Sequence, residues 1–81
     1  MIRVEKQNID FEQDRRVYEA YLLYDTKEES EAIYEEFTDF DLQEYDRGEI
    51  TLNVESHWYD TKKEFMKEIR SRVRELNKYG Y

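Results

Sequence analysis

The chain has 81 residues, of which 21 are Asp or Glu and 13 are Lys or Arg, so its net charge at pH 7 is −8. It contains no cysteine, which excludes disulfides and thiolate chemistry, and its length predicts one domain over residues 1–81 with a small core. No stretch approaches the ~18 apolar residues of a membrane span, and the first residues lack the apolar run of a signal peptide, so a cytoplasmic protein is expected.

The first part of the chain predicts two strands and a helix. Apolar residues favour a strand over residues 1–9, and the run RVYEAYLLY, rich in aromatic and β-branched residues, favours a second strand over 16–24. The side chains that share one face of this second strand are Tyr18, Ala20, Leu22 and Tyr24. Asp25 or Thr26 is a good N-cap, which predicts that a helix follows over 26–38.

Two further strands are predicted after this helix. Residues 40–45 favour a short strand, and Gly48 supplies the positive φ of a hairpin turn that begins at Asp46 and Arg47. From 49 to 59 apolar residues alternate with polar ones, which predicts the fourth strand, and Trp58 falls on its apolar side.

The last part predicts a second helix over 61–78, which Asp60 or Thr61 caps and which ends at Gly80. The order ββαββα indicates an α+β fold, a small antiparallel sheet of about four strands with two helices on one face. The segment YDTK at 24–27 recurs at 59–62. This repeat reflects either a ββα duplication or two independent uses of the same capping residues.

Residues 25–49 form an acidic stretch, with eleven Asp or Glu against two Lys or Arg. In the predicted helix, at about 100° per residue, the Glu side chains line the side opposite the apolar residues. Three interpretations are open: this face is solvated, it contacts a basic protein partner, or it pairs with the basic flank of the second helix. That basic flank consists of Lys63, Lys67, Arg70, Arg74 and Lys78.

Binding to a basic protein is the interpretation we develop. Carboxylates one helical turn apart have Cβ atoms ~5–6 Å from each other, a spacing similar to that of phosphates along a nucleic-acid strand. Such a face would block the nucleic-acid groove of a basic nucleic-acid-binding protein. The residues expected to make the contact are Glu28, Glu31, Glu35, Glu36, Asp39 and Asp41, with Tyr34 or Tyr45 as aromatic anchors.

In size, charge and aromatic content, the chain is similar in general character to the small acidic anti-restriction and anti-CRISPR proteins that phages encode. This similarity rests on no shared motif. A monomer or homodimer without membrane contact and without a cofactor is expected. The alternative is a small housekeeping or assembly module that homo-oligomerises through an aromatic strand face and buries Tyr18 and Tyr24.

Catalysis, metal binding and direct nucleic-acid binding have little support in the sequence. Ser56 and His57 are neighbours on the predicted fourth strand, so they point to opposite faces and cannot pair. His57 is the only histidine, so zinc would lack ligands, and the segment that starts at Asp39 lacks the Gly at the sixth position of a calcium loop. The net charge repels nucleic acid. A non-enzymatic protein without a metal is therefore expected.

Overall fold

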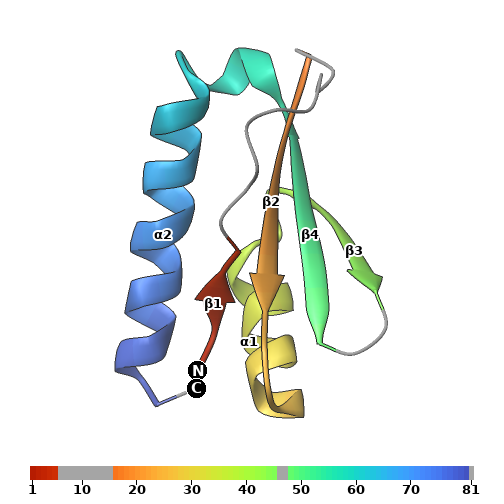
Figure 1. The fold of residues 1–81 in the computed structure, drawn as a ribbon, viewed down its shortest axis with the longest axis vertical. Helices are drawn as coiled ribbons and strands as arrows, with labels where there is room; N and C mark the ends of the chain where they lie inside the picture. The colour runs from red at the N-terminus through yellow and green to blue at the C-terminus, as the bar shows by residue number, and fades with distance from the viewer. Residues whose placement is uncertain (6–15, 46–47, 81) are drawn as a thin grey trace.

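The computed structural model describes residues 1–5, 16–45 and 48–80, and it confirms the α+β fold and the order ββαββα (Figure 1). The strands are β1 (Arg3–Val4), β2 (Val17–Leu23), β3 (Asp41–Tyr45) and β4 (Glu49–Glu55). The helices are α1 (Lys27–Glu36) and α2 (Lys62–Lys78), with a short 3-10 helix, η1 (Ser56–Trp58), between β4 and α2. Residues 6–9 of the predicted first strand and Asp46 and Arg47 of the predicted turn lie outside the described residues.

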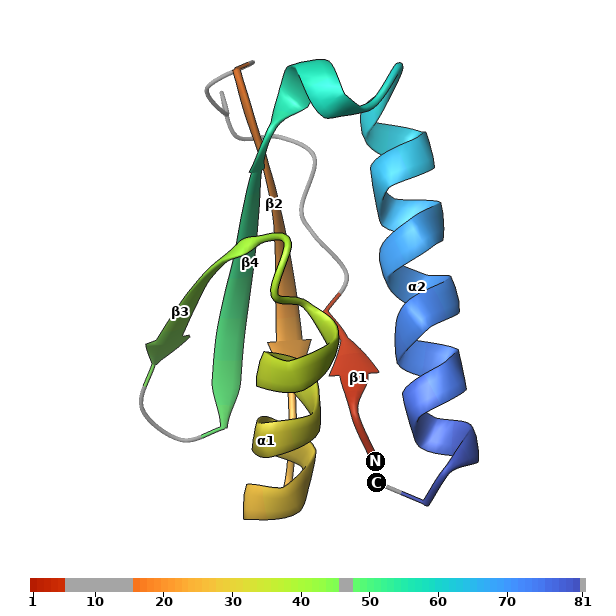
Figure 2. The same ribbon diagram turned by 180° about the vertical axis from the view of Figure 1, so that it is seen from behind.

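The strands form one antiparallel sheet in the order β1-β2-β4-β3. Within it, Ile50 of β4 pairs with Leu22 of β2, and Leu52 of β4 pairs with Leu42 of β3. Both helices cover the same face of the sheet. Helix α1 lies behind β2 and β4 in Figure 1 and in front of them in Figure 2, while α2 runs beside β1 in both views.

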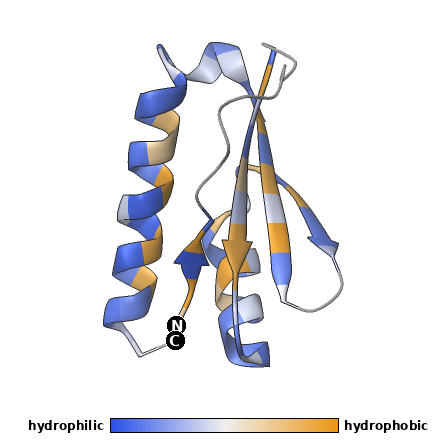
Figure 3. Ribbon diagram, in the orientation of Figure 1, coloured by the Kyte–Doolittle hydropathy of each residue, from blue (hydrophilic) through white to orange (hydrophobic). Residues whose placement is uncertain are grey.

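The core fills the space between the sheet and the two helices. In the middle of the two central strands, alternate residues that point to the helices are fully buried, because alternate side chains of a strand point to the same face. These strand residues are Ala20, Leu22, Ile50 and Leu52. Figure 3 shows the apolar stripe of α2 turned toward the sheet. The other buried apolar residues are Ile2, Ala32, Ile33, Phe37, Phe40, Phe65, Met66, Ile69, Val73 and Leu76.

Threonine caps begin both helices, as the capping signals predict. Thr26 accepts a hydrogen bond from the Glu29 amide, and the Glu29 side chain returns one to the Thr26 amide, so α1 begins with a complete capping box. Thr61 accepts from the Glu64 amide at the start of α2. Each YDTK segment thus supplies the Thr that caps a helix, which is compatible with both interpretations of the repeat. Neither helix in the described residues could cross a membrane.

The fourth strand ends earlier than predicted. β4 stops at Glu55, and the chain turns through η1, which the Tyr59 amide closes by donating to the Ser56 carbonyl at 3.1 Å. The prediction that Trp58 lies on the apolar side of a strand is therefore wrong, because the turn rotates its side chain outward and leaves it 70% exposed. Ser56 and His57 are likewise not strand neighbours on opposite faces.

Tyr18 and Tyr24 lie on the core side of the sheet. Both are partly buried and pack against the core, and the ring centroid of Tyr18 is 5.7 Å from that of Phe65 in α2. The strand face that a homo-oligomer was expected to bury is therefore covered by the helices of the same chain. The opposite face of the sheet carries Tyr21 and Tyr45.

Candidate protein-binding surface

The outer side of α1, which we call the acidic face, consists of Glu28, Glu31 and Glu35. The helix turns these residues outward because Ala32 and Ile33 are buried on its other side. All three carboxylates are exposed, and none has an ion-pair partner in the part of the chain that the structure describes. The acidic face is therefore a row of negative charge that the described fold does not neutralise.

Glu36 and Asp39, two further predicted contact residues, are bound by Arg72 of α2. The Arg72 Nε lies 3.0 Å from Glu36 Oε1, and Asp39 accepts from both terminal nitrogens, at 3.1 and 3.2 Å. Arg72 also donates to the Glu36 carbonyl oxygen. The Arg72 guanidinium lowers the pKa of Asp39 below its usual value. These two carboxylates thus help to join α1 to α2.

The basic flank of α2 does not face α1. Arg72, which contacts α1, is nine residues beyond Lys63, and at about 100° per residue it points to the opposite side of the helix. The flank residues Lys63, Lys67, Arg70 and Arg74 are exposed and form no ion pair with another described residue, while Lys78 lies 3.9 Å from Glu75. The internal pairing considered above therefore runs through Arg72, which was not among the flank residues.

The remaining predicted contact residues lie elsewhere on the surface. Asp41 and Tyr45 sit on the face of β3 that is turned away from the helices, where both are exposed. Tyr34 is 39% exposed on α1, and its hydroxyl donates to Glu44 at 3.3 Å. The structure therefore divides the eight predicted residues among α1, the Arg72 contact and the outer face of the sheet.

Glu44 has a role that the sequence interpretation missed. Its Oε1 accepts from the hydroxyls of Tyr24 and Ser30, and its Oε2 accepts from the hydroxyl of Tyr34. The hydrogen bond to Glu44 raises the pKa of the Tyr24 hydroxyl. Strand alternation was the available signal, because it places Glu44 with Leu42 on the helix side of β3.

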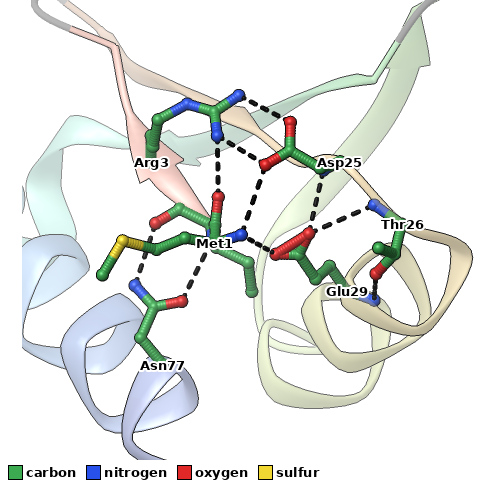
Figure 4. A network of polar contacts seen from close by, with 7 residues as sticks. Met1, Arg3, Asp25, Thr26, Glu29 and Asn77 are labelled. Atoms are coloured by element: carbon green, nitrogen blue, oxygen red, sulfur yellow. Dashed lines mark hydrogen bonds and ion pairs between the residues drawn. The ribbon is translucent and has the colours of Figure 1, made fainter. Parts of the chain in front are cut away.

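Two more acidic residues of the stretch are used inside the fold (Figure 4). The Met1 ammonium lies 2.7 Å from Glu29 Oε2 and 3.3 Å from Asp25 Oδ2, and Arg3 lies 2.8 Å from the same Asp25 oxygen. Burial raises the pKa of Glu29, but the Met1 ammonium and two backbone amides lower it more, so it ends below its usual value. Hydrogen bonds from Arg3 and Met1 lower the pKa of Asp25 to about 2.

A pocket of about 370 Å³ opens beside η1. The residues that line it are Asp39, Phe40, Val54, Trp58, Tyr59 and Glu68. The Tyr59 hydroxyl donates to Glu68, and burial together with this contact raises the pKa of Tyr59. The sequence interpretation missed the pocket because it placed Trp58 in a strand.

Within residues 1–5, 16–45 and 48–80, no group of three or more His, Cys, Asp or Glu side chains is arranged to hold a metal ion. His57 Nδ1 lies 3.2 Å from Glu55 Oε2, and both side chains are exposed. Comparison of the chain with protein-family models, curated proteins and solved structures returned no match.

Proposed function

We propose that this protein is a non-catalytic binding protein whose acidic face on α1 occupies a basic surface of a protein partner. The observation that carries the proposal is the exposure of Glu28, Glu31 and Glu35 without an ion-pair partner among the described residues. Other carboxylates of the acidic stretch pair with cations or hydroxyl groups of the same chain, so the lack of a partner in the described part of the chain distinguishes these three from them. A like-charged row costs folding stability, which favours a use outside the fold.

The finer form of the proposal is that the acidic face stands in for nucleic-acid phosphates. The three carboxylates follow one helix side at successive turns, with ~5–6 Å between neighbouring Cβ atoms. A groove that binds a phosphate backbone presents Lys and Arg at a similar spacing. The partner class is then a basic nucleic-acid-binding protein, and the role is that of an anti-restriction or anti-CRISPR inhibitor. The net charge of −8 would speed its association with such a partner.

The test is competition with DNA for a panel of restriction endonucleases and CRISPR effector nucleases. A fluorescently labelled duplex is bound to each nuclease, and its release by the protein is followed as salt increases. We expect release from at least one nuclease, and the competition should weaken with salt because exposed charges are screened. If no nuclease in the panel releases its duplex, the phosphate-mimic form of the proposal is wrong.

A pair of variants separates the acidic face from total charge. Glu28→Lys, Glu31→Lys and Glu35→Lys together change the net charge from −8 to −2, since each substitution adds two charges. The matched control changes Glu5, Glu64 and Glu75 to Lys, which gives the same net charge at exposed sites off α1. The first variant should lose competition and the control should keep most of it. Equal competition by both variants would show that the acidic face is not the contact.

A further inference from the structure

We propose that the pocket beside η1 binds an arginine side chain of the protein partner. The partner's being a basic protein rests on the proposed function, whereas the pocket's preference for arginine rests on its own lining. That lining combines aromatic rings with carboxylates, which is the chemistry that a guanidinium recognises.

The aromatic part of the pocket is unusually open for so small a domain. Trp58 is 70% exposed, although burial of a Trp side chain would add more to stability than that of almost any other residue. The His57 ring lies with its centroid 5.2 Å from that of Trp58, at 31° between the planes, and so supports the indole. A planar guanidinium can stack on the free indole surface.

The carboxylates of the pocket keep unused acceptor capacity. Asp39 accepts two hydrogen bonds from Arg72, and a carboxylate has about four lone-pair sites, so it can accept more. Its side chain is 60% exposed, which leaves these sites open to a ligand. In Glu68, Oε2 accepts from the Tyr59 hydroxyl, and Oε1 has no partner among the described residues. Two carboxylates against one Arg72 leave the pocket with net negative charge.

The shape of this site favours arginine over lysine. A guanidinium offers five N–H donors in a flat fork, so it can stack on Trp58 and donate to carboxylates at its edge together. An ammonium is a compact, strongly hydrated charge that cannot stack in this way. Asp39 also follows the end of α1 closely, so the pocket lies near the end of the acidic face that contains Glu35.

The experiment uses Trp58 as its reporter, because this is the only tryptophan in the chain. The protein is titrated with a tetra-arginine amide and with a tetra-lysine amide at 0.15 M salt, and the tryptophan emission is followed. We expect a saturable change in emission with tetra-arginine. The affinity for tetra-lysine should be lower by a factor of about five or more, because lysine cannot stack on the indole.

Matched variants identify the contact. Glu68→Gln should weaken tetra-arginine binding about tenfold, because a charge-assisted hydrogen bond is lost. Glu64→Gln removes the same charge one turn away on α2, outside the pocket lining, and should change the affinity less than about twofold at this ionic strength. Trp58→Ala, measured by calorimetry, should weaken binding about fivefold or more, and circular dichroism checks that each variant is folded.

Three results would overturn the arginine pocket: equal affinity for the two peptides, equal loss in the two Glu→Gln variants, or unchanged affinity in Trp58→Ala. The titration contains no nuclease and no DNA. A negative result therefore leaves the competition experiment on the acidic face standing, and a failed competition leaves the titration standing. The two proposals can in this way fail separately.

Discussion

Arg72 of α2 binds both carboxylate oxygens of Asp39, three residues beyond the end of α1, at 3.1 and 3.2 Å. The same guanidinium lies over the rings of Phe37 and Phe40, with its carbon 4.6 and 5.3 Å from their centroids. It therefore covers part of the core while it pairs with two carboxylates of the acidic stretch, Glu36 and Asp39. The carboxylates of Glu36 and Asp39 therefore help to hold the fold together, whereas those of Glu28, Glu31 and Glu35 face outward.

Arg72→Ala should lower the free energy of unfolding by about 2 kcal/mol, because charged hydrogen bonds and the covering of two aromatic rings are lost. Arg74→Ala removes an exposed cation from the basic flank and should cost no more than about 0.5 kcal/mol. Urea denaturation followed by circular dichroism measures both. Similar losses in the two variants would show that Arg72 does not join the helices. Arg72→Lys should recover only part of the loss, because lysine lacks the planar fork.

The contacts of Asp25 predict how stability depends on pH. Its pKa is about 2 in the fold against a usual value of 3.8, so its charge stabilises the fold above pH ~4 and this contribution disappears as the pH falls toward 2. Asp25→Asn should therefore be less stable than the parent at pH 7, and the two stabilities should converge by pH 2. Urea denaturation at several pH values gives the difference. A difference that stays constant over this range would contradict the assignment.

The Met1 ammonium predicts that the stability of the fold also decreases at alkaline pH. Its contact with Glu29 raises its pKa above the usual 8.0, so its stabilisation is complete below pH 8 and is lost as the pH rises through the higher value. Denaturation between pH 7 and 10 should show this decline. Glu29→Gln keeps the side-chain acceptor of the capping box but lacks the charge, so its decline should be smaller. An equal decline in both proteins would show that Glu29 is not the ammonium's partner.

Glu35→Lys should stabilise the fold and weaken partner binding. Glu35 lies four residues after Glu31 and in the last turn of α1, where a negative charge meets both a like charge and the negative end of the helix dipole. A lysine there reverses both interactions, for a gain of about 0.5–1 kcal/mol at low salt. Denaturation in low and high salt tests the gain, which should fade with salt. A loss of stability would mean that Glu35 has a favourable contact in the fold.

Gly48→Ala should be much more costly than Gly80→Ala, although both residues have positive φ, 88° and 85°. A Cβ on Gly48 would lie 2.6 Å from the carbonyl oxygen of Tyr24, whereas a Cβ on Gly80 meets no atom within 4 Å. The first change should cost about 2–3 kcal/mol or more and the second about 1 kcal/mol. Thermal unfolding compares the two, and equal losses would show that the close approach to Tyr24 is unimportant.

The elements that the sequence predicted well are those with local signals. Thr26 and Thr61 mark helix starts because the capping hydrogen bond spans only three residues. The buried residues of β2 and of α2 follow their periods of two and 3.6. The prediction for Trp58 was wrong because it extended the strand past Ser56, a polar residue at an apolar position of the alternation, where the 3-10 helix begins.

The candidate site was predicted only in part. The helical period places Glu28, Glu31 and Glu35 on one side of α1, and no distant residue is needed to see this. The contacts that Glu36 and Asp39 make depend on Arg72, which is 36 and 33 residues away along the chain. Such a contact leaves no periodic signal, so these residues could not be told apart from the exposed ones.

By itself, the sequence determined the element order, the helix caps, the buried faces and the acidic side of α1. Each of these depends on residues within a few positions of one another, through hydrogen bonds and side-chain periods. Only the tertiary structure decided the strand order β1-β2-β4-β3, the pairing of Arg72 with Asp39 and the opening of the pocket at Trp58. These features depend on which distant segments pack together, and that is set by burial of the whole core rather than by any local pattern.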